Sequence, residues 1–384
     1  MLFAACNCRS HPSSISRRGL LCAGGAGFVS ALIGTLAGTS RTAPAQALGS
    51  RVPEVDRLAV RIVTDNYFFP YFLPQKYDGL TVERFTRAET PQKPPSRELI
   101  GQWGLSMHAE SHVGSQSRSI LIDFGYTPDA LLNNLDLLKI DPSLMDALVL
   151  SHGHYDHFGG LSGFLAATKG QLKNSVPFFV GGEECFCTRE LPNGAQYGSL
   201  DRKAIIDSNL TLMIAEGPSV VADHAFTTGQ IPFSSFEKPL TPTRMKAGIN
   251  DGWGCFPEQL PPQKNATTFI PDDMQHEIGT NFVVKGKGLV VLTSCSHRGV
   301  VNTVKQAQAA SGVQKVHAII GGMHLVPPLT DDYIRETVLA LKAINPDYIM
   351  AAHCSGDTFY DIAKTEMPNK VIRSAVGTRL VFGA

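Results

Sequence analysis

Short apolar runs recur along the chain, and segments with helical spacing of apolar positions lie between several of them. Residues 58–64 alternate apolar and polar positions, as expected of a strand buried on one face. Residues 131–138 carry apolar positions at helical spacing. Further strands are predicted at 104–109, 119–125, 147–150, 177–182, 210–214, 225–232, 288–293, 316–320 and 346–352, and further helices begin at 161 and 300. This alternation predicts an α/β fold.

Two segments show no sustained periodicity. Residues 67–96 contain five prolines and predict a long loop that lines a functional site. Residues 233–271 are rich in Pro, Lys and Gly, and Trp253 stands there between two glycines. We predict a lid or substrate loop in this second segment. Trp253 either covers a ligand or anchors the loop by its own burial.

The densest polar cluster, SHGHYDHFGG at 151–160, follows the apolar run 147–150. His152 and His154 are alternate residues, so both can reach one ion from the same side of an extended loop. Asp156 and His157 are then free to reach a second ion. Imidazole nitrogens and a carboxylate are the ligands that a cation such as zinc takes. We therefore predict a metal site on this strand-to-helix turn, in preference to a surface loop that holds three histidines by chance.

Three later predicted strands also end in a histidine. His297 follows one strand within SCSHRG, His324 follows the next within GGMH, and His353 follows the last within HCSG. Ligands collected at one edge of a sheet require this arrangement, which packing alone does not explain. Cys295 shares a side with His297, so both are candidates to face a metal.

The H-x-H-x-D-H string resembles the signature of the metallo-β-lactamase superfamily, whose fold is an αββα sandwich. The combination of GHYDHFGGL, TSCSHRGVVNTV, IIGGMHL and AHCSG resembles its dihydropterin-methyl-ribofuranosylaminobenzene-phosphate synthase-like branch of metal-dependent hydrolases. The resemblance implies an αββα sandwich with loop insertions. It also implies two divalent ions, expected to be zinc, with manganese or iron as alternatives. The implied metal ligands are His152, His154, Asp156, His157, His297 and His353, with His324 facing the pocket.

Asp123 begins an Asp-x-Gly that resembles another early motif of the superfamily, and it is predicted to support the metal loop from behind. Gln230 occupies a place where many members carry a metal-binding histidine, and neutral Gln is a poor zinc ligand. Either His224 supplies that nitrogen or the site draws it from further along the chain. We favour His297, because His224 enters its strand from the far end and is expected to be solvated.

The first 47 residues predict an export signal. The pair Arg17-Arg18 precedes a Gly/Ala-rich apolar run, and small residues at 43–47 resemble a cleavage site after Ala47. The arginine pair indicates the twin-arginine route. The run is near the lower length limit for spanning a membrane, so we expect removal and no stable membrane anchor. This predicts a periplasmic protein with a single domain over 48–384 and a lid insertion at about 233–271.

The charge of the chain limits the partners that we expect, and its cysteines limit the possible disulfides. Basic and acidic residues number 34 each, and the leader carries four basic residues and no acidic one, which leaves 30 against 34. Without a basic excess we expect no nucleic acid; the expected partners are a small-molecule substrate and the twin-arginine export machinery. Five cysteines follow the leader, so at least one is unpaired. Either Cys185 or Cys187 can pair with Cys255, or all three are buried small side chains.

These features predict an exported hydrolase that uses a metal-bound hydroxide on an ester, lactone, amide or phosphodiester-type small molecule. Asp156 is the candidate to orient the nucleophile. His324 is the candidate to protonate the leaving group, with a structural role as the alternative. A pterin-condensing transferase on the same fold is a second interpretation, although a pterin biosynthetic step belongs in the cytoplasm. A non-catalytic metal-dependent binding protein is the third.

Overall fold

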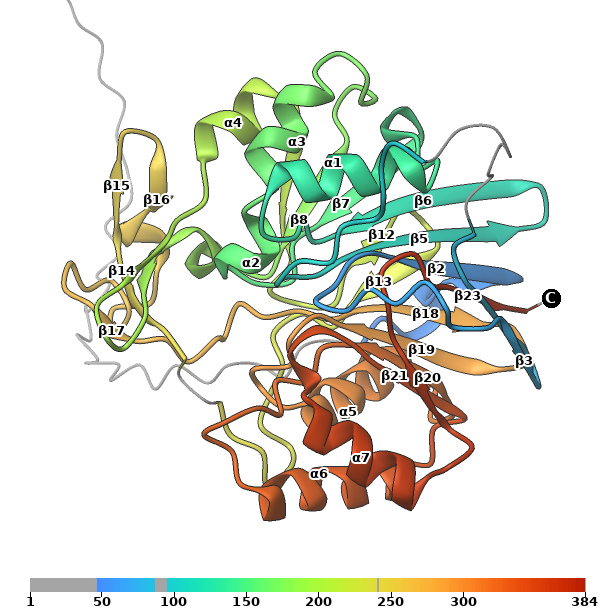
Figure 1. The fold of residues 1–384 in the computed structure, drawn as a ribbon. Helices are drawn as coiled ribbons and strands as arrows, with labels where there is room; N and C mark the ends of the chain where they lie inside the picture. The colour runs from blue at the N-terminus through green and yellow to red at the C-terminus, as the bar shows by residue number, and fades with distance from the viewer. Residues whose placement is uncertain (1–46, 87–94, 240–241, 384) are drawn as a thin grey trace, which may run out of the picture. The chain divides into compact units, whose positions relative to one another are not determined.

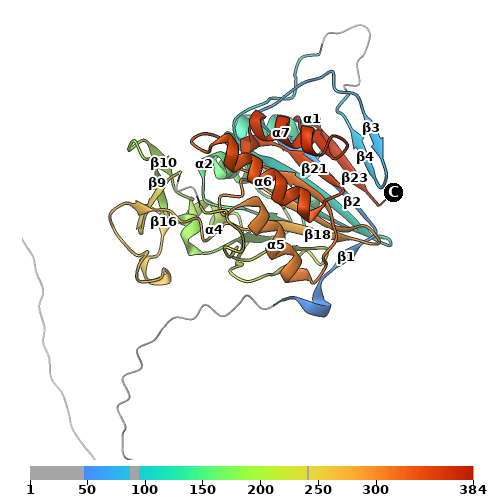
Figure 2. The same ribbon diagram turned by 90° about the horizontal axis from the view of Figure 1, so that it is seen from below.

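Two large β-sheets lie face to face in the computed structural model, which describes residues 47–86, 95–239 and 242–383 (Figure 1). Helices α1 (Pro128–Leu137) and α3 (Leu161–Ala167) lie on the outer side of one sheet, and α5 (Val300–Ser311), α6 (Asp331–Ile344) and α7 (Asp357–Glu366) lie on the outer side of the other. This is the predicted αββα sandwich with insertions. Figure 2 shows α5, α6 and α7 side by side over the second sheet.

The first large sheet joins strands from both ends of the chain. Its interior strand β2 pairs with β23, so that Leu58 lies opposite Phe382. On the other side of β2 the sheet becomes parallel from β6 to β11. The strands in spatial order are β11 (Thr211–Ile214), β8 (Pro177–Val180), β7 (Ala147–Val149), β6 (Gln116–Ile122), β5 (Ser106–Val113), β2 (Arg57–Thr64), β23 (Arg379–Phe382), β4 (Leu80–Glu83) and β3 (Gln75–Tyr77).

The second large sheet supplies the remaining strand ends of the site. Strands β19 to β22 run parallel, because α5, α6 and α7 connect them as crossovers. The strands in order are β12 (Val220–Val221), β13 (Ala225–Thr227), β18 (Thr280–Val284), β19 (Gly288–Thr293), β20 (Val316–Gly321), β21 (Tyr348–Ala351) and β22 (Val371–Arg373), and β1 (Glu54–Val55) pairs with β18.

Three apolar layers hold this arrangement together. Between the sheets, alternate residues of β2 such as Val60 and Ile62 pack in one buried cluster with Phe282 of β18. A second cluster joins α1 and α3 to the first sheet, and a third joins α5, α6 and α7 to the second sheet. Each fully buried Val, Ile or Phe side chain contributes about 1.5–3 kcal/mol. These layers fix the edge at which the strand-end histidines meet.

The remaining described elements are short. The helical ones are η1 (Gly49–Arg51), η2 (Pro142–Leu144), α2 (Tyr155–Phe158), η3 (Glu183–Phe186), α4 (Arg202–Asp207), η4 (Pro257–Gln259) and η5 (His353–Ser355). A small sheet contains β10 (Gln196–Gly198), β9 (Thr188–Glu190), β14 (Arg244–Lys246) and β17 (Ile270–Pro271), and β15 (Gly248–Asn250) pairs with β16 (Trp253–Cys255). The predicted lid segment therefore contains strands, and its function as a lid stays a prediction.

One disulfide joins the residue after η3 to the predicted lid segment. Cys187 is bonded to Cys255, while Cys185 is buried and free, which decides between the two pairings that the sequence left open. Trp253 is 42% exposed, so burial of this side chain does not anchor the segment.

The prediction of a continuous loop over 67–96 is wrong in part. Strands β3 and β4 form a hairpin there, because β23 from the C-terminal end of the chain pairs with β4. The predicted export signal at 1–47 lies outside the described residues except for Ala47. Within the described ranges, no helix combines the length and apolar character needed to cross a membrane.

Candidate metal centre

The structure brings all six predicted metal ligands to one place, where they form two neighbouring groups. In each group the ligand atoms lie within 4.8 Å of one another. The first group comes from the loop after β7 and the end of β19, and the second from α2 and the start of η5. The first group is His152, His154 and His297, and the second is Asp156, His157 and His353. Strand ends of both large sheets therefore converge on one centre.

Several imidazole nitrogens in this centre are buried and have no hydrogen-bond partner among the described residues. They are Nε2 of His152, both ring nitrogens of His297 and Nδ1 of His324. A buried polar atom left unpaired costs about 1–3 kcal/mol, so native structures rarely keep several together. A divalent cation satisfies such lone pairs directly. The residues present therefore fit the metal ions that the sequence predicts.

Asp123 lies behind the metal loop, as predicted. Its Oδ2 lies 2.7 Å from Nδ1 of His157, and it also accepts the hydroxyl proton of Ser151 at 2.8 Å. The Ser151 oxygen in turn accepts from Nδ1 of His152 at 2.8 Å. These contacts assign the Nδ1–H tautomer to both histidines, and their Nε2 lone pairs point into the centre.

Three orienting residues were not predicted. Thr243 Oγ1 lies 3.0 Å from Nε2 of His154, which leaves Nδ1 of that ring for an ion. Asn66 Oδ1 lies 2.9 Å from Nδ1 of His353, and Asp65 accepts from the His353 backbone amide at 2.9 Å. Asp65 and Asn66 directly follow β2 and have the sequence of an ordinary turn, so only their position after a strand indicated a role.

Burial sets the protonation of most of the centre. It lowers the pKa of His152, His154 and His297 well below 6.5, and these rings are neutral at pH 7, as metal ligands must be. Burial raises the pKa of Asp156, but the interactions with His157 and His353 outweigh it and hold this pKa below its usual range. Asp156 is therefore a carboxylate.

The Asp156 carboxylate has a partner on each oxygen. The hydroxyl of Tyr197 donates to Oδ1 at 2.7 Å, and Nε2 of His353 lies 3.2 Å from Oδ2. Burial lowers the pKa of His353, but Cys354 and Asp156 raise it to about 9. In the metal-free protein, His353 is therefore protonated, and this proton takes the place of a cation beside the Asp156 carboxylate.

The backbone is strained at several positions of the centre. Asp123, Ser296, His324 and His353 have φ values of 57°, 58°, 46° and 50°, in the left-handed region that residues with a Cβ rarely adopt. Such strain costs of order 1–3 kcal/mol per residue and persists where the surroundings enforce it. The turn at Ser296 lies between Cys295 and His297, and side chains on both sides of it reach the centre.

The alternative third histidine lies elsewhere. His224 is 2% exposed, and its Nδ1 lies 3.0 Å from the hydroxyl of Ser111. It is thus buried and not solvated, contrary to the prediction, and it belongs to none of the ligand groups among the described residues. Gln230 accepts a hydrogen bond from Gln275 at 2.8 Å. His297 occupies the first group instead.

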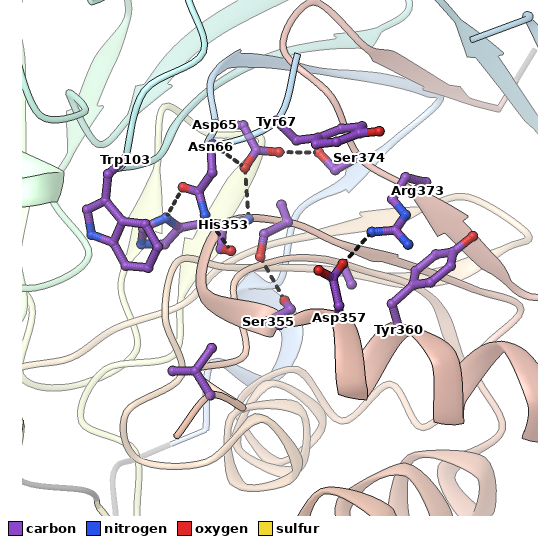
Figure 3. A pocket seen from close by; sticks show the side chains of 14 residues that line it. Asp65, Asn66, Tyr67, Trp103, His353, Ser355, Asp357, Tyr360, Arg373 and Ser374 are labelled. Atoms are coloured by element: carbon purple, nitrogen blue, oxygen red, sulfur yellow. Dashed lines mark hydrogen bonds and ion pairs between the residues drawn. The ribbon is translucent and has the colours of Figure 1, made fainter. Parts of the chain in front are cut away.

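Two cavities border the centre. One of about 250 Å³ adjoins His353, and Trp103 flanks it with its ring 4.9 Å from the His353 ring (Figure 3). On its other side Arg373 pairs with Asp357 at 2.8 Å and lies 3.6 Å from the centre of the Tyr360 ring.

The second cavity, of about 20 Å³, is lined by His297, His324 and Glu237. His324 therefore lines this smaller cavity, and its role in the site stays a prediction. Burial lowers the pKa of His324, but contact with Cys354 raises it above 6.5.

Comparison with known proteins identifies the class of protein. The family model of the metallo-β-lactamase superfamily matches residues 113–172, which include the central motif. A crystal structure described as a metal-dependent hydrolase of the β-lactamase superfamily has the same fold, with a TM-score of 0.60 and 20% identity over 84% of this chain and 98% of that one. The fold is thus that of the superfamily's metal-dependent hydrolases.

Relatives in Methanocaldococcus jannaschii indicate the branch of the superfamily to which the chain belongs. A protein named 7,8-dihydropterin-6-methyl-4-(β-D-ribofuranosyl)-aminobenzene-5′-phosphate synthase is 30% identical over 264 residues, 66% of this chain and 81% of the relative. A second protein, described as uncharacterised, is 27% identical over 283 residues, 73% of this chain and 94% of the relative. The chain belongs to the metallo-β-lactamase superfamily, in the branch that contains this synthase.

Proposed function

We propose that this protein is an exported metal-dependent hydrolase that cleaves an ester, lactone, amide or phosphodiester bond in a small molecule. The observation that carries the proposal is the pair of adjacent ligand groups with unpartnered imidazole nitrogens. Two divalent cations held there, most simply zinc, would activate water and polarise the oxygen of the bond under attack. The family fold supports metal binding at this edge of the sandwich.

Asp156 is the residue proposed to orient the nucleophile. Its carboxylate is fixed by the Tyr197 hydroxyl on one oxygen and faces His353 on the other. A carboxylate held in this way accepts a hydrogen bond from an attacking water and directs its lone pair. Burial of the whole centre excludes bulk water, which strengthens each of these interactions.

His324 is the residue proposed to protonate the leaving group. Its Nδ1 has no partner, and its ring lies 4.3 Å from the ring of His297 beside the smaller cavity. A histidine at this position can move a proton to an oxygen or nitrogen that departs next to the first ligand group.

The cavity beside His353 is the proposed substrate site. Its volume of about 250 Å³ suits a small molecule, and Trp103 and Tyr67 supply aromatic surfaces on its wall (Figure 3). Arg373 adds one cation, which is already paired with Asp357, so the site is polar without a large net charge.

The test loads the purified chain with zinc and assays chromogenic carboxylic esters, a lactone, an anilide and a phosphodiester. The proposal is supported if the protein turns over a substrate and chelation abolishes this turnover. His152→Ala should then be inactive, and His108→Ala should stay active. His108 is a matched control, because this histidine lies on β5 and bonds to Ser119 outside the centre. Metal-loaded protein that turns over none of the four classes would overturn it.

A pterin-condensing synthase is the second candidate, favoured by the 30% identity to the archaeal synthase. The same cations would then stabilise a leaving diphosphate. Incubation of zinc-loaded protein with a dihydropterin-methyl diphosphate and ribofuranosylaminobenzene phosphate decides between the two. A condensed product detected by mass spectrometry, together with no turnover of the hydrolase substrates, selects the synthase.

A further inference from the structure

Two free cysteines lie at the metal centre, and the proposed chemistry does not use them. Cys295 follows β19 and Cys354 lies in η5, and both are at most 2% exposed. Their sulfur atoms lie 3.3 Å apart. Gly322 makes room for this pair, since a Cβ there would lie 2.9 Å from the Cys354 sulfur. The chain thus places sulfur beside imidazole.

Cys295 occupies the space between the two ligand groups. Its sulfur lies 3.1 Å from Nε2 of His157, a member of the second group. It also lies within 4.8 Å of the ligand nitrogen of His152, a member of the first group. Because Nδ1 of His157 binds Asp123, the Nε2 facing this sulfur carries a lone pair. Nε2 of His152 is buried and has no hydrogen-bond partner in the described part of the chain.

We propose that Cys295 is a metal ligand of this centre and supplies a thiolate between the two histidine groups. On binding, the thiol loses its proton to solvent and a sulfur–metal bond replaces the sulfur–hydrogen bond. The inference rests on the metal site of the proposed function, but not on the reaction that the site performs.

Charge balance supports a second anionic ligand. Asp156 is the only anion among the six predicted ligands, whereas two divalent cations would bring four positive charges into a buried site. Uncompensated charge in such a site is costly, and a thiolate next to the imidazoles reduces it. Cys354 does not have this position, because it shares a group only with Cys295 and His324.

A thiolate ligand also restricts which metal binds. Sulfur donors favour zinc, ferrous iron or cobalt over magnesium and calcium, which prefer oxygen ligands. The centre is therefore expected to retain zinc or iron during purification and to reject magnesium.

Cobalt substitution tests the assignment without measuring turnover. The Co²⁺-loaded protein is expected to show a sulfur-to-cobalt charge-transfer band in the near ultraviolet, which Cys295→Ser removes and Cys354→Ser keeps. Cys185→Ser is the second control, because this buried free thiol lies in η3 outside the ligand groups. A band that depends on Cys354, or no band in the loaded wild type, would overturn the proposal.

If Cys295→Ser does not fold, X-ray absorption of the zinc-loaded wild type decides alone. A sulfur scatterer at about 2.3 Å is expected, and a shell of nitrogen and oxygen only overturns the inference. That negative result leaves the hydrolase proposal intact if zinc-dependent turnover is present. Failure to bind any ion overturns both.

Discussion

Nδ1 of His353 lies 2.9 Å from the side-chain oxygen of Asn66, although 287 positions separate the two residues. The Asn66 amide group returns a hydrogen bond to the His353 carbonyl at 2.8 Å, so both the ring and the backbone of the histidine are held. Because Nδ1 donates to Asn66, Nε2 is the ring nitrogen that faces the centre and becomes the ligand atom once its proton is lost. The end of β2 therefore orients a ligand that the strand end of the opposite sheet supplies.

His297→Ala is expected to lose at least one of two bound ions, because one ring nitrogen of His297 belongs to the first ligand group and neither ring nitrogen has a hydrogen-bond partner among the described residues. The loss of metal affinity should exceed the roughly 10–100-fold typical of residues behind the ligands. Elemental analysis after mild chelation measures it. His224→Ala is the control and keeps both ions, since His224 bonds to Ser111. If His224→Ala loses an ion and His297→Ala keeps both, the assignment of His297 as the third metal-binding histidine is wrong.

Asp123→Asn is expected to lower metal affinity by about 10–100-fold while the protein stays folded. The amide cannot accept from His157 Nδ1, Ser151 N and the Ser151 hydroxyl in the way that the carboxylate does. Competition with a chromogenic chelator measures the change. Asp223→Asn alters an exposed carboxylate paired with Arg118 and should leave the affinity unchanged. Equal affinities for all three proteins would contradict the supporting role of Asp123.

Trp103→Ala is expected to raise KM by about 2- to 10-fold, equivalent to 0.5–1.5 kcal/mol of lost aromatic contact, with little change in kcat. Trp103 is 48% exposed beside His353 and borders the proposed substrate cavity. Steady-state kinetics on the best substrate of the panel provide the measurement. Ile206→Ala removes an exposed apolar side chain on α4 outside this cavity and serves as control. A fall in kcat with unchanged KM would place Trp103 in a different role.

Glu237→Gln is expected to be more stable than the wild type at pH 8, and this difference is expected to be smaller at pH 5. Burial raises the pKa of Glu237 to about 7 from 4.5, although Asn302 N and Ser235 donate to its carboxylate. The folded state therefore binds the proton more tightly, and wild-type stability falls as pH rises from about 4.5 through about 7, by a few kcal/mol at most.

Thermal unfolding of the Glu237→Gln variant and the wild type at several pH values tests this. The difference in Tm should grow between pH 5 and pH 8, because the amide stays neutral throughout. The same comparison for the exposed Glu258→Gln provides the baseline. Parallel pH curves for Glu237→Gln and wild type would show that the carboxyl is not held in its neutral form.

Replacing both Arg17 and Arg18 with lysine is expected to leave unprocessed precursor in the cytoplasm, because the twin-arginine receptor reads the arginine pair and not charge alone. Cell fractionation and N-terminal sequencing measure processing and location. Arg9→Lys, which alters an arginine outside the pair, is the control. Normal cleavage after Ala47 in the double variant would indicate another export route.

Local pattern predicted the parts of the site that strands deliver. β7, β19 and β21 are short apolar runs, and a histidine follows the C-terminal end of each. Both the strand and its candidate ligand can therefore be predicted from the local sequence. The residues that orient the ligands were not readable in this way. Asn66, Thr243 and Tyr197 act through contacts with histidines or an aspartate far along the chain, and only the tertiary fold determines those contacts.

The same distinction explains the errors in the predicted fold. β3 and β4 lie among prolines and lack a strong alternation, and they form because β23 offers a free edge for pairing. The Cys187 pairing likewise depends on where β16 is held relative to η3. Long-range partners override weak local preference at these positions.

The distribution of ligands over both sheets determines when a newly made chain can acquire its metal. The motif that begins with His152 leaves the ribosome long before His353, and each ligand group needs a residue from the later half. A chain stalled before β19 would lack both His297 and His353, and so would offer only part of each ligand group. Metal binding is therefore expected late in folding. A tightly bound ion indicates that the two sheets have already packed together.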